Sequence, residues 1–327
     1  MRDLTPTLRR RGLLLAFAAL PWRNAAAQPV FPGKPITLIV PFAPGGVADI
    51  TARTVAQAMA ASLGQPIVVD NRPGAGAIVA SQAVLQAPAD GHTLLLMSNA
   101  NAVSVHLFKK LPYDVTQAFA PISTLGFFDL GLAVRSDSRF KTLADLLQYG
   151  RANPGKLSIG TIAVGSTQHL AAELFKSRAG IDAVIVPYKG SPAVINALRA
   201  GEIDLAFEIL SPLLPQLSAK VIRALAVTGD KRFALLPEVP TVQQQGVANY
   251  VAASWNALAA PAATPPAVIE RLRRAAQEAI DQPAVGQRLR ELGVTPQGST
   301  PAALAALLTR EIARWGEVVR AAKIEPE

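Results

Sequence analysis

VPFAPGGVADITARTVAQAM, residues Val40 to Met59, joins an apolar strand to an amphipathic helix through Pro44-Gly45-Gly46. A strand that enters a helix through a glycine turn leaves backbone N–H groups free at the positive end of the helix dipole, where they can bind an anion. Two interpretations stay open on this stretch alone. Either Gly45 and Gly46 let a ligand approach the backbone, or they only form a tight turn and Asp49 only caps the helix.

The rest of the chain alternates strand-like and helix-like segments, which predicts an α/β protein with parallel strands and helical crossovers. The segments expected to form strands are 36–40, 67–70, 93–97, 130–134, 157–161, 183–186, 203–207 and 222–227. Helices are expected near 49–63, 76–86, 142–152, 167–179 and 191–200. Near the C-terminus the segments 265–281, 284–292 and 301–322 predict three more helices, each with a proline near its start.

Two more turns resemble the first one in chemistry. GTIAVGSTQH, residues 160–169, follows a predicted strand with glycine and hydroxyl residues and then continues into a helix. Ser98, Asn99 and Asn101 follow the strand 93–97, at the carboxyl end where open α/β sheets bind their ligands. Polar turns in both halves of a chain long enough for two domains predict a binding cleft between those domains.

The first 27 residues are predicted to be a signal peptide. Arginines at 9–11 precede the apolar run 13–20, and small residues at 25–27 precede Gln28, the expected start of the mature protein. The apolar run is shorter than the roughly 20 residues that span a bilayer, so a retained anchor is disfavoured. Sec and Tat export both stay open, because Arg10-Arg11 also fits a twin-arginine signal. We therefore expect a soluble, exported protein.

Composition excludes several classes of function. The chain has no cysteine, so it contains no disulfide and no thiolate metal site. Its formal charge is +9, of which the signal peptide contributes +4 through five arginines and one aspartate, leaving +5. These remaining charges are scattered along the sequence, so nucleic-acid binding is not expected.

Strings that resemble enzyme signatures fail on their context. Residues 150–156 have the GxxxxGK spacing of a phosphate loop, but Leu157 stands where Ser or Thr must contact magnesium. Residues 73–79 resemble a dinucleotide turn, but Val79 occupies the third glycine position. The three histidines lie in separate segments and form no metal or triad motif. No catalytic residue, metal or cofactor is therefore predicted.

A series of strings, in order along the mature chain, resembles the Bug proteins, which are the TctC-like receptors of tripartite tricarboxylate transporters. The strings are PITLIVPFAPGGVADITAR, IVVDNRPGAG, ADGHTLLL, FAPIS, PYKG, GEIDLAFE, RALAVTG, LLPEVPTV, SWNALAAPA and IARWGEVVRAA. The resemblance implies a periplasmic binding protein type II-like fold, a Venus flytrap of two α/β lobes with two crossings near 125–130 and 226–230. Lobe 1 is then expected to hold 28–125 and 229–327, and lobe 2 to hold 126–228.

The resemblance also implies a function. Members of this family capture small carboxylates, amino-acid-like solutes or nicotinate-like rings in the periplasm and deliver them to a membrane permease with a large and a small subunit. We expect a monomer that does the same, without enzyme activity. Two alternatives stay open: a signalling co-receptor that presents its solute to a membrane sensor, and an exported enzyme that uses the same cleft.

The family's ligand loops map onto five segments of this sequence. They give Ala43, Gly45, Gly46 and Asp49 after the first strand, Ser98, Asn99 and Asn101 after the third, Gly165, Ser166, Thr167 and His169 before the helix 167–179, Tyr188 and Lys189 in PYKG, and Glu208.

Two positions depart from the family pattern. Glu208 replaces a frequent aspartate, and Asn256 stands where relatives often carry an aromatic residue. If Glu208 lines the cleft, it favours an ammonium or amide N–H on the solute and opposes a polyanion. We therefore expect a monocarboxylate or amino-acid-like solute rather than citrate. Glu208 can also be paired with another side chain or face solvent, and this alternative stays open.

Overall fold

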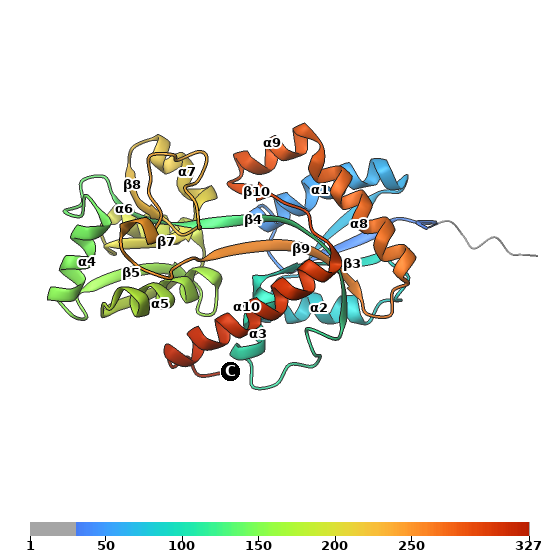
Figure 1. The fold of residues 1–327 in the computed structure, drawn as a ribbon, viewed down its shortest axis with the longest axis horizontal. Coiled ribbons are helices and arrows are strands. Elements are labelled where there is room, and N and C mark those ends of the chain that lie inside the picture. Colours follow the sequence, from blue (N-terminus) through green and yellow to red (C-terminus); the bar gives the residue numbers. More distant parts are fainter. Residues whose placement is uncertain (1–30, 327) are drawn as a thin grey trace, which may run out of the picture. The chain divides into compact units, whose positions relative to one another are not determined.

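The strand β4 (Phe119–Arg135) connects two groups of strands into one sheet (Figure 1). The computed structural model describes residues 31–326. Residues 119–129 of β4 pair with β9, whereas residues 130–135 pair with β7 and β8. We call the group of strands that contains residues 119–129 of β4 the first half-sheet, and the group that contains residues 130–135 the second half-sheet.

The first half-sheet is β2-β1-β3-β9-β4, with β10 added to β4. Its strands besides β4 are β1 (Ile36–Val40), β2 (Ile67–Asn71), β3 (Thr93–Ser98), β9 (Ala253–Pro261) and β10 (Val294–Pro296). The strands β2, β1 and β3 are parallel to one another, and β9 is antiparallel to both β3 and β4.

The second half-sheet is β4-β7-β5-β6, with β8 added to β4. Its other strands are β5 (Leu157–Ile162), β6 (Ala183–Tyr188), β7 (Leu205–Ile209) and β8 (Ile222–Val227). The strands β7, β5 and β6 are parallel, as the alternation of strands and helices predicts.

Helices cover both half-sheets. Among the residues described, they are α1 (Val47–Leu63), the 3₁₀ turn η1 (Ala75–Ala77), α2 (Ile78–Leu85), α3 (Asn99–Leu107), α4 (Leu143–Ala152), α5 (Thr167–Ala179), α6 (Ser191–Ala200), α7 (Leu210–Ser218), the 3₁₀ turn η2 (Gln243–Gln245), α8 (Pro266–Asp281), α9 (Pro283–Glu291) and α10 (Pro301–Ala321). No helix in this part of the chain combines the length and the apolarity needed to cross a membrane.

Side chains that alternate between the two faces of the first half-sheet form an apolar core on each face. Leu38 and Leu258 point to the face covered by α1, α8 and α9. Leu95 and Ala257 point to the opposite face, where α2, α3 and α10 pack. Because successive side chains of a strand point to opposite faces, the predominantly apolar strands β1, β3 and β9 contribute side chains to both cores.

Most predicted elements lie within two residues of their expected positions. The segments that were not predicted are the helices α3 and α7, the 3₁₀ turn η2, the strands β9 and β10 and the first half of β4. The segment 229–251 was assigned to lobe 1, yet Phe233 and Val239 pack against Leu210 and Val227 beside the second half-sheet. The lobe boundaries stay a prediction, and the expected signal peptide lies outside the described residues.

Candidate functional site

The turn between β1 and α1 is exposed and contains free backbone donors. Ala43, Gly45 and Gly46 are all exposed, and Gly45 has φ 84°, a conformation that favours glycine. The first N–H groups of a helix have no acceptor within the helix. No described side chain caps α1 at Gly46, so the donors of its first turn stay available to a ligand.

Asp49, in contrast, is used within the protein. Its carboxylate accepts hydrogen bonds from the Gly45 amide at 2.9 Å, from Arg53 and from Asn71, and it is 2 % exposed. Burial raises the pKa of Asp49, but the hydrogen bonds from Arg53, Gly45 and Asn71 outweigh this effect and hold the pKa below its ordinary value. Asp49 therefore fixes the turn, and its side chain is not free to contact a solute.

The turn between β3 and α3 is held by a reciprocal capping arrangement. The Ser98 hydroxyl accepts from the Ala100 amide, and the Asn101 side-chain oxygen accepts from the Ser98 amide at 3.0 Å. The Asn101 nitrogen donates to Ser81, so both polar atoms of this buried side chain have a partner within the protein. Asn101 thus shapes the turn instead of facing a ligand.

The start of α5 closely approaches the end of α3. Gly165 has φ 78°, and a Cβ atom placed on it would lie 2.2 Å from Leu107 Cδ1, so no larger residue fits without movement. Ser166 caps α5 by accepting from the His169 amide. Burial lowers the pKa of His169, which favours the neutral ring that accepts from the Gly165 amide at 3.4 Å.

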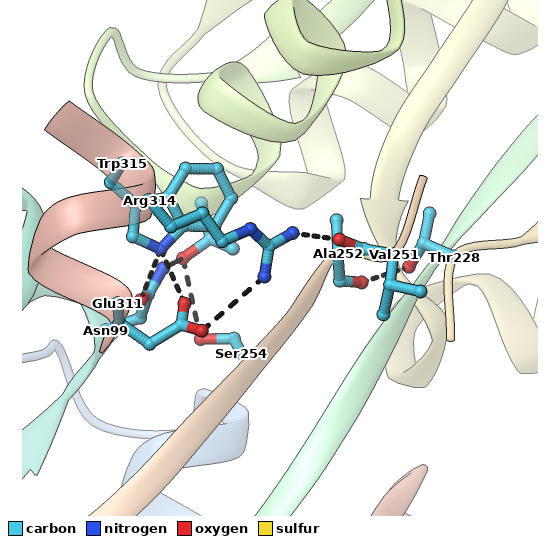
Figure 2. Close-up of polar contacts among 9 residues, drawn as sticks. Asn99, Thr228, Val251, Ala252, Ser254, Glu311, Arg314 and Trp315 are labelled. Carbon is cyan, nitrogen blue, oxygen red and sulfur yellow. Dashed lines mark hydrogen bonds and ion pairs between the residues drawn. The ribbon is translucent and has the colours of Figure 1, made fainter. Parts of the chain in front are cut away.

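Asn99 and Thr167 connect the two half-sheets directly. The Asn99 side-chain nitrogen donates to the Thr167 hydroxyl at 3.0 Å, and the Thr167 hydroxyl also lies 3.5 Å from that of Ser254 on β9. On its other side, Asn99 accepts from Trp315 Nε1, which also donates to Glu311 (Figure 2). Two predicted ligand residues therefore bind each other.

The helix α10 carries a further contact toward the second half-sheet. Arg314 donates to the carbonyl of Val251, just before β9, and Arg314 also lies next to Glu311 (Figure 2). The helix packs against α3 and α5 as well. It therefore packs against one helix that follows each half-sheet.

Glu208, at the end of β7, is buried and paired through one oxygen. Its Oε1 accepts from Gln168 at 2.6 Å and from the Ile209 amide at 2.8 Å. Its Oε2 is buried without a hydrogen-bond partner among the described residues. Burial raises the pKa of Glu208, and the hydrogen bonds from Gln168 and Ile209 only partly oppose this effect. The alternative that Glu208 is paired therefore holds for one of its two oxygens.

Tyr188 and Lys189 follow β6 and stay apart from these contacts. Tyr188 is half-buried opposite Ile162 of β5, and Lys189 is exposed. Burial and the nearby Glu202 raise the pKa of Tyr188. No hydrogen bond among the described residues connects either side chain to the starts of α1, α3 or α5.

Sequence reasoning missed several partners of the predicted residues. Arg53 stands four residues after Asp49, a helical spacing that predicts the ion pair. Gln168 lies in the first turn of the helix predicted over 167–179, but its partner Glu208 is 40 residues away. Trp315 bonds a residue 216 positions away, for which a single sequence contains no signal.

Comparison with known families identifies relatives along nearly the whole chain. A family model described as "Tripartite tricarboxylate transporter family receptor" matches residues 51–324. A "UPF0065 protein in tcbD-tcbE intergenic region" of Pseudomonas sp. strain P51 is 38% identical over 320 residues, which is 97% of this chain and 95% of that protein.

Three solved structures share the fold. "R. palustris Rpa4515 with adipate" has a TM-score of 0.82 and 34% identity, and covers 91% of this chain and 100% of its own. "MatC (Rpa3494) from Rhodopseudomonas palustris with bound malate" has a TM-score of 0.77 and 32% identity, and the match covers 88% of this chain and 100% of that chain. The "periplasmic binding protein BugD" has a TM-score of 0.79 and 28% identity, and the match covers 91% of this chain and 100% of that chain. These matches confirm the predicted periplasmic-binding-protein fold.

Proposed function

Because this chain belongs to the tripartite tricarboxylate transporter receptor family, whose members are periplasmic solute-binding receptors, we propose that it captures a small organic carboxylate and delivers it to a permease of that type. We further propose that it is exported to the periplasm by its signal peptide and acts as a monomer. Two of the similar structures hold adipate and malate, which supports a carboxylate as the solute.

One observation carries the proposal: the start of α1 offers uncapped amides next to an exposed glycine turn. Backbone amides at a helix N-terminus neutralise a carboxylate without a cationic side chain. Such binding is reversible, as delivery to a permease requires. In our proposal the start of α5 and Glu208 contact the other end of the solute, so that the closed arrangement alone satisfies both ends.

The buried oxygen of Glu208 bears on the choice of solute. A carboxylate that already accepts two hydrogen bonds on Oε1 still offers Oε2 to an ammonium, hydroxyl or amide donor. A second or third carboxylate on the solute would find no hydrogen-bond donor at Oε2 of Glu208. We therefore propose a monocarboxylate or amino-acid-like solute in preference to citrate.

Native mass spectrometry of the freshly purified protein tests the receptor function, because such a protein is expected to retain a solute from its host. Titration calorimetry with adipate, malate, nicotinate, glutamate and citrate then measures the preference. We expect at least one carboxylate to bind and to be recovered chemically unchanged. Conversion of the solute into a product would identify an enzyme instead.

The variant Glu208→Gln separates the two parts of this proposal. It keeps the size of the side chain and removes its negative charge, so citrate is expected to bind the variant more tightly than the natural protein. Citrate affinity that stays the same in both proteins would show that Glu208 does not set the preference. Binding of no carboxylate at all would contradict the receptor function itself.

A further inference from the structure

Asn256 of β9 is fully buried, and neither its side-chain oxygen nor its nitrogen has a hydrogen-bond partner among the described residues. Buried amide groups in native proteins are nearly always hydrogen-bonded, since an unpaired one costs free energy without any gain. A side chain with both polar atoms unpaired therefore points to a group that the protein itself does not supply.

Strand pairing places Asn256 beside the turn at the end of β3. It lies directly opposite Ser98, the last residue of β3 and the cap of α3. On the other side, its partner in β4 is Gly126, which has no side chain. Directly opposed residues of antiparallel strands share one face of the sheet, so Asn256 and Ser98 lie on the same face.

The same face carries the start of α1. Leu258 and Ala260, two and four residues after Asn256, pack in the apolar core with Val47 and Ala48 of α1. The register between β3 and β9 is regular over these residues, so Asn256 also points to the α1 side. The unpaired amide thus lies on the face where α1 begins without a capping side chain.

A second unpaired group lies on α1 itself. Thr51 belongs to the buried face of this helix, is 0 % exposed, and its hydroxyl has no hydrogen-bond partner among the described residues. The start of α1 and the facing strand β9 therefore each carry a buried polar side chain without a partner. Both observations are independent of the free amides at the helix end.

We propose that Asn256 is a specificity-determining residue of the solute site. It recognises a neutral group that both donates and accepts hydrogen bonds, a hydroxyl or a carboxamide, next to the carboxylate held by the start of α1. Its oxygen accepts from that group and its nitrogen donates to it, whereas an ammonium or a second carboxylate satisfies only one of the two atoms. This inference rests on the proposed carboxylate-receptor function.

Paired solutes that differ only in this group test the assignment. Titration calorimetry compares succinate with malate and succinamate, and propionate with lactate. The natural protein is expected to bind the hydroxyl or carboxamide member of a pair at least roughly tenfold more tightly than its partner. Asn256→Leu, which has a similar volume and no polar atoms, is expected to reduce this ratio to about one by weakening the polar member.

Trp255→Phe is the matched control. Trp255 is the neighbouring residue, and its Nε1 is also buried without a partner, but its side chain packs in the core on the opposite face. This variant is expected to keep the preference for malate over succinate. Thermal unfolding without solute provides a second readout, in which Asn256→Leu is expected to raise the melting temperature because two unpaired polar atoms are removed.

The outcomes separate the two levels of inference. Equal affinity of the natural protein for the members of each pair, or a preference that survives Asn256→Leu, would overturn the role of Asn256 and leave the carboxylate receptor intact. Binding of no member of any pair would contradict the receptor function, and the role of Asn256 with it.

Discussion

The side-chain nitrogen of Asn99, at the start of α3, donates a hydrogen bond of 3.0 Å to the hydroxyl of Thr167, at the start of α5. These helices follow strands of the two different half-sheets. The bond therefore joins two turns that were each predicted to face a solute. The protein's own side chains thus occupy each other at these two turns, whereas no described side chain caps the start of α1.

Removal of this bond is expected to loosen the connection between the half-sheets. Thr167→Val leaves Asn99 without its acceptor, so we expect a loss of about 1 kcal/mol in the free energy of unfolding. We also expect a larger radius of gyration in small-angle scattering of the solute-free protein. Thr264→Val is the control, because the buried Thr264 hydroxyl has no partner among the described residues. An unchanged radius for Thr167→Val would mean that the bond does not hold the half-sheets together.

A larger residue at Gly165 is expected to destabilise the protein. Gly165→Ala combines a positive φ with a Cβ atom 2.2 Å from Leu107, so either Leu107 rotates or α5 moves away from α3. Gly180→Ala has a similar φ of 62° but open space around the new atom. We expect denaturant unfolding to show that Gly165→Ala costs about 1 kcal/mol more than Gly180→Ala, whose cost is about 1 kcal/mol. Equal costs would show that the approach of α3 and α5 is not tight in solution.

Asp129 is expected to make stability depend on pH. It is the last residue of β4 that pairs with β9, and a Cβ atom on Gly229 would lie within 3 Å of its carboxylate. Burial, with the nearby Asp230, raises the pKa of Asp129 from 3.8 to about 6. The folded protein therefore holds this proton more tightly than the unfolded chain, and the free energy of unfolding falls as pH rises from about 4 to about 6.

The variant Asp129→Asn tests this dependence. It is expected to remove the change between pH 4 and 6 and to raise the free energy of unfolding at pH 8 by roughly 1 kcal/mol, since solvent screens part of the effect at this partly buried site. Asp230→Asn removes only the charge of Asp230 that repels the Asp129 carboxylate, and it is expected to give a smaller change in the same direction. Identical pH profiles for Asp129→Asn and the natural protein would refute a raised pKa at this position.

The fold was largely predictable because apolar residues recur with a different period in its strands than in its helices. The unpredicted segments lack that signal for physical reasons. The helix α7 contains Pro212 and Pro215, and α3 is rich in asparagine and valine, which are poor helix formers. The strand β9 is rich in alanine, and β4 is interrupted by Pro121 and Gly126, so neither sequence favours a strand.

The strand-to-helix turns of the candidate site were predictable, but the contacts of their side chains were not. Glycines and hydroxyl residues after strands located the turns correctly. Asp49 is bound within its own turn partly through Asn71, and one oxygen of Glu208 is paired through Gln168. Asn256 differs from the family pattern, but only its burial without a partner distinguishes it from a surface asparagine. Such information comes from contacts between residues far apart in the sequence.

The central claim is that backbone amides at the start of α1 hold the carboxylate of the solute. Proline is well accepted at the first position of a helix, so Val47→Pro removes one of these amides with little effect on the helix. Val47→Ala is the control, because it shortens the side chain and keeps the amide.

Titration calorimetry of both variants, with the tightest-binding member of adipate, malate and nicotinate, tests the claim most directly. We predict that Val47→Pro binds the solute roughly tenfold more weakly than Val47→Ala, since a hydrogen bond to a charged group is lost. Equal affinities of the two variants would contradict the account.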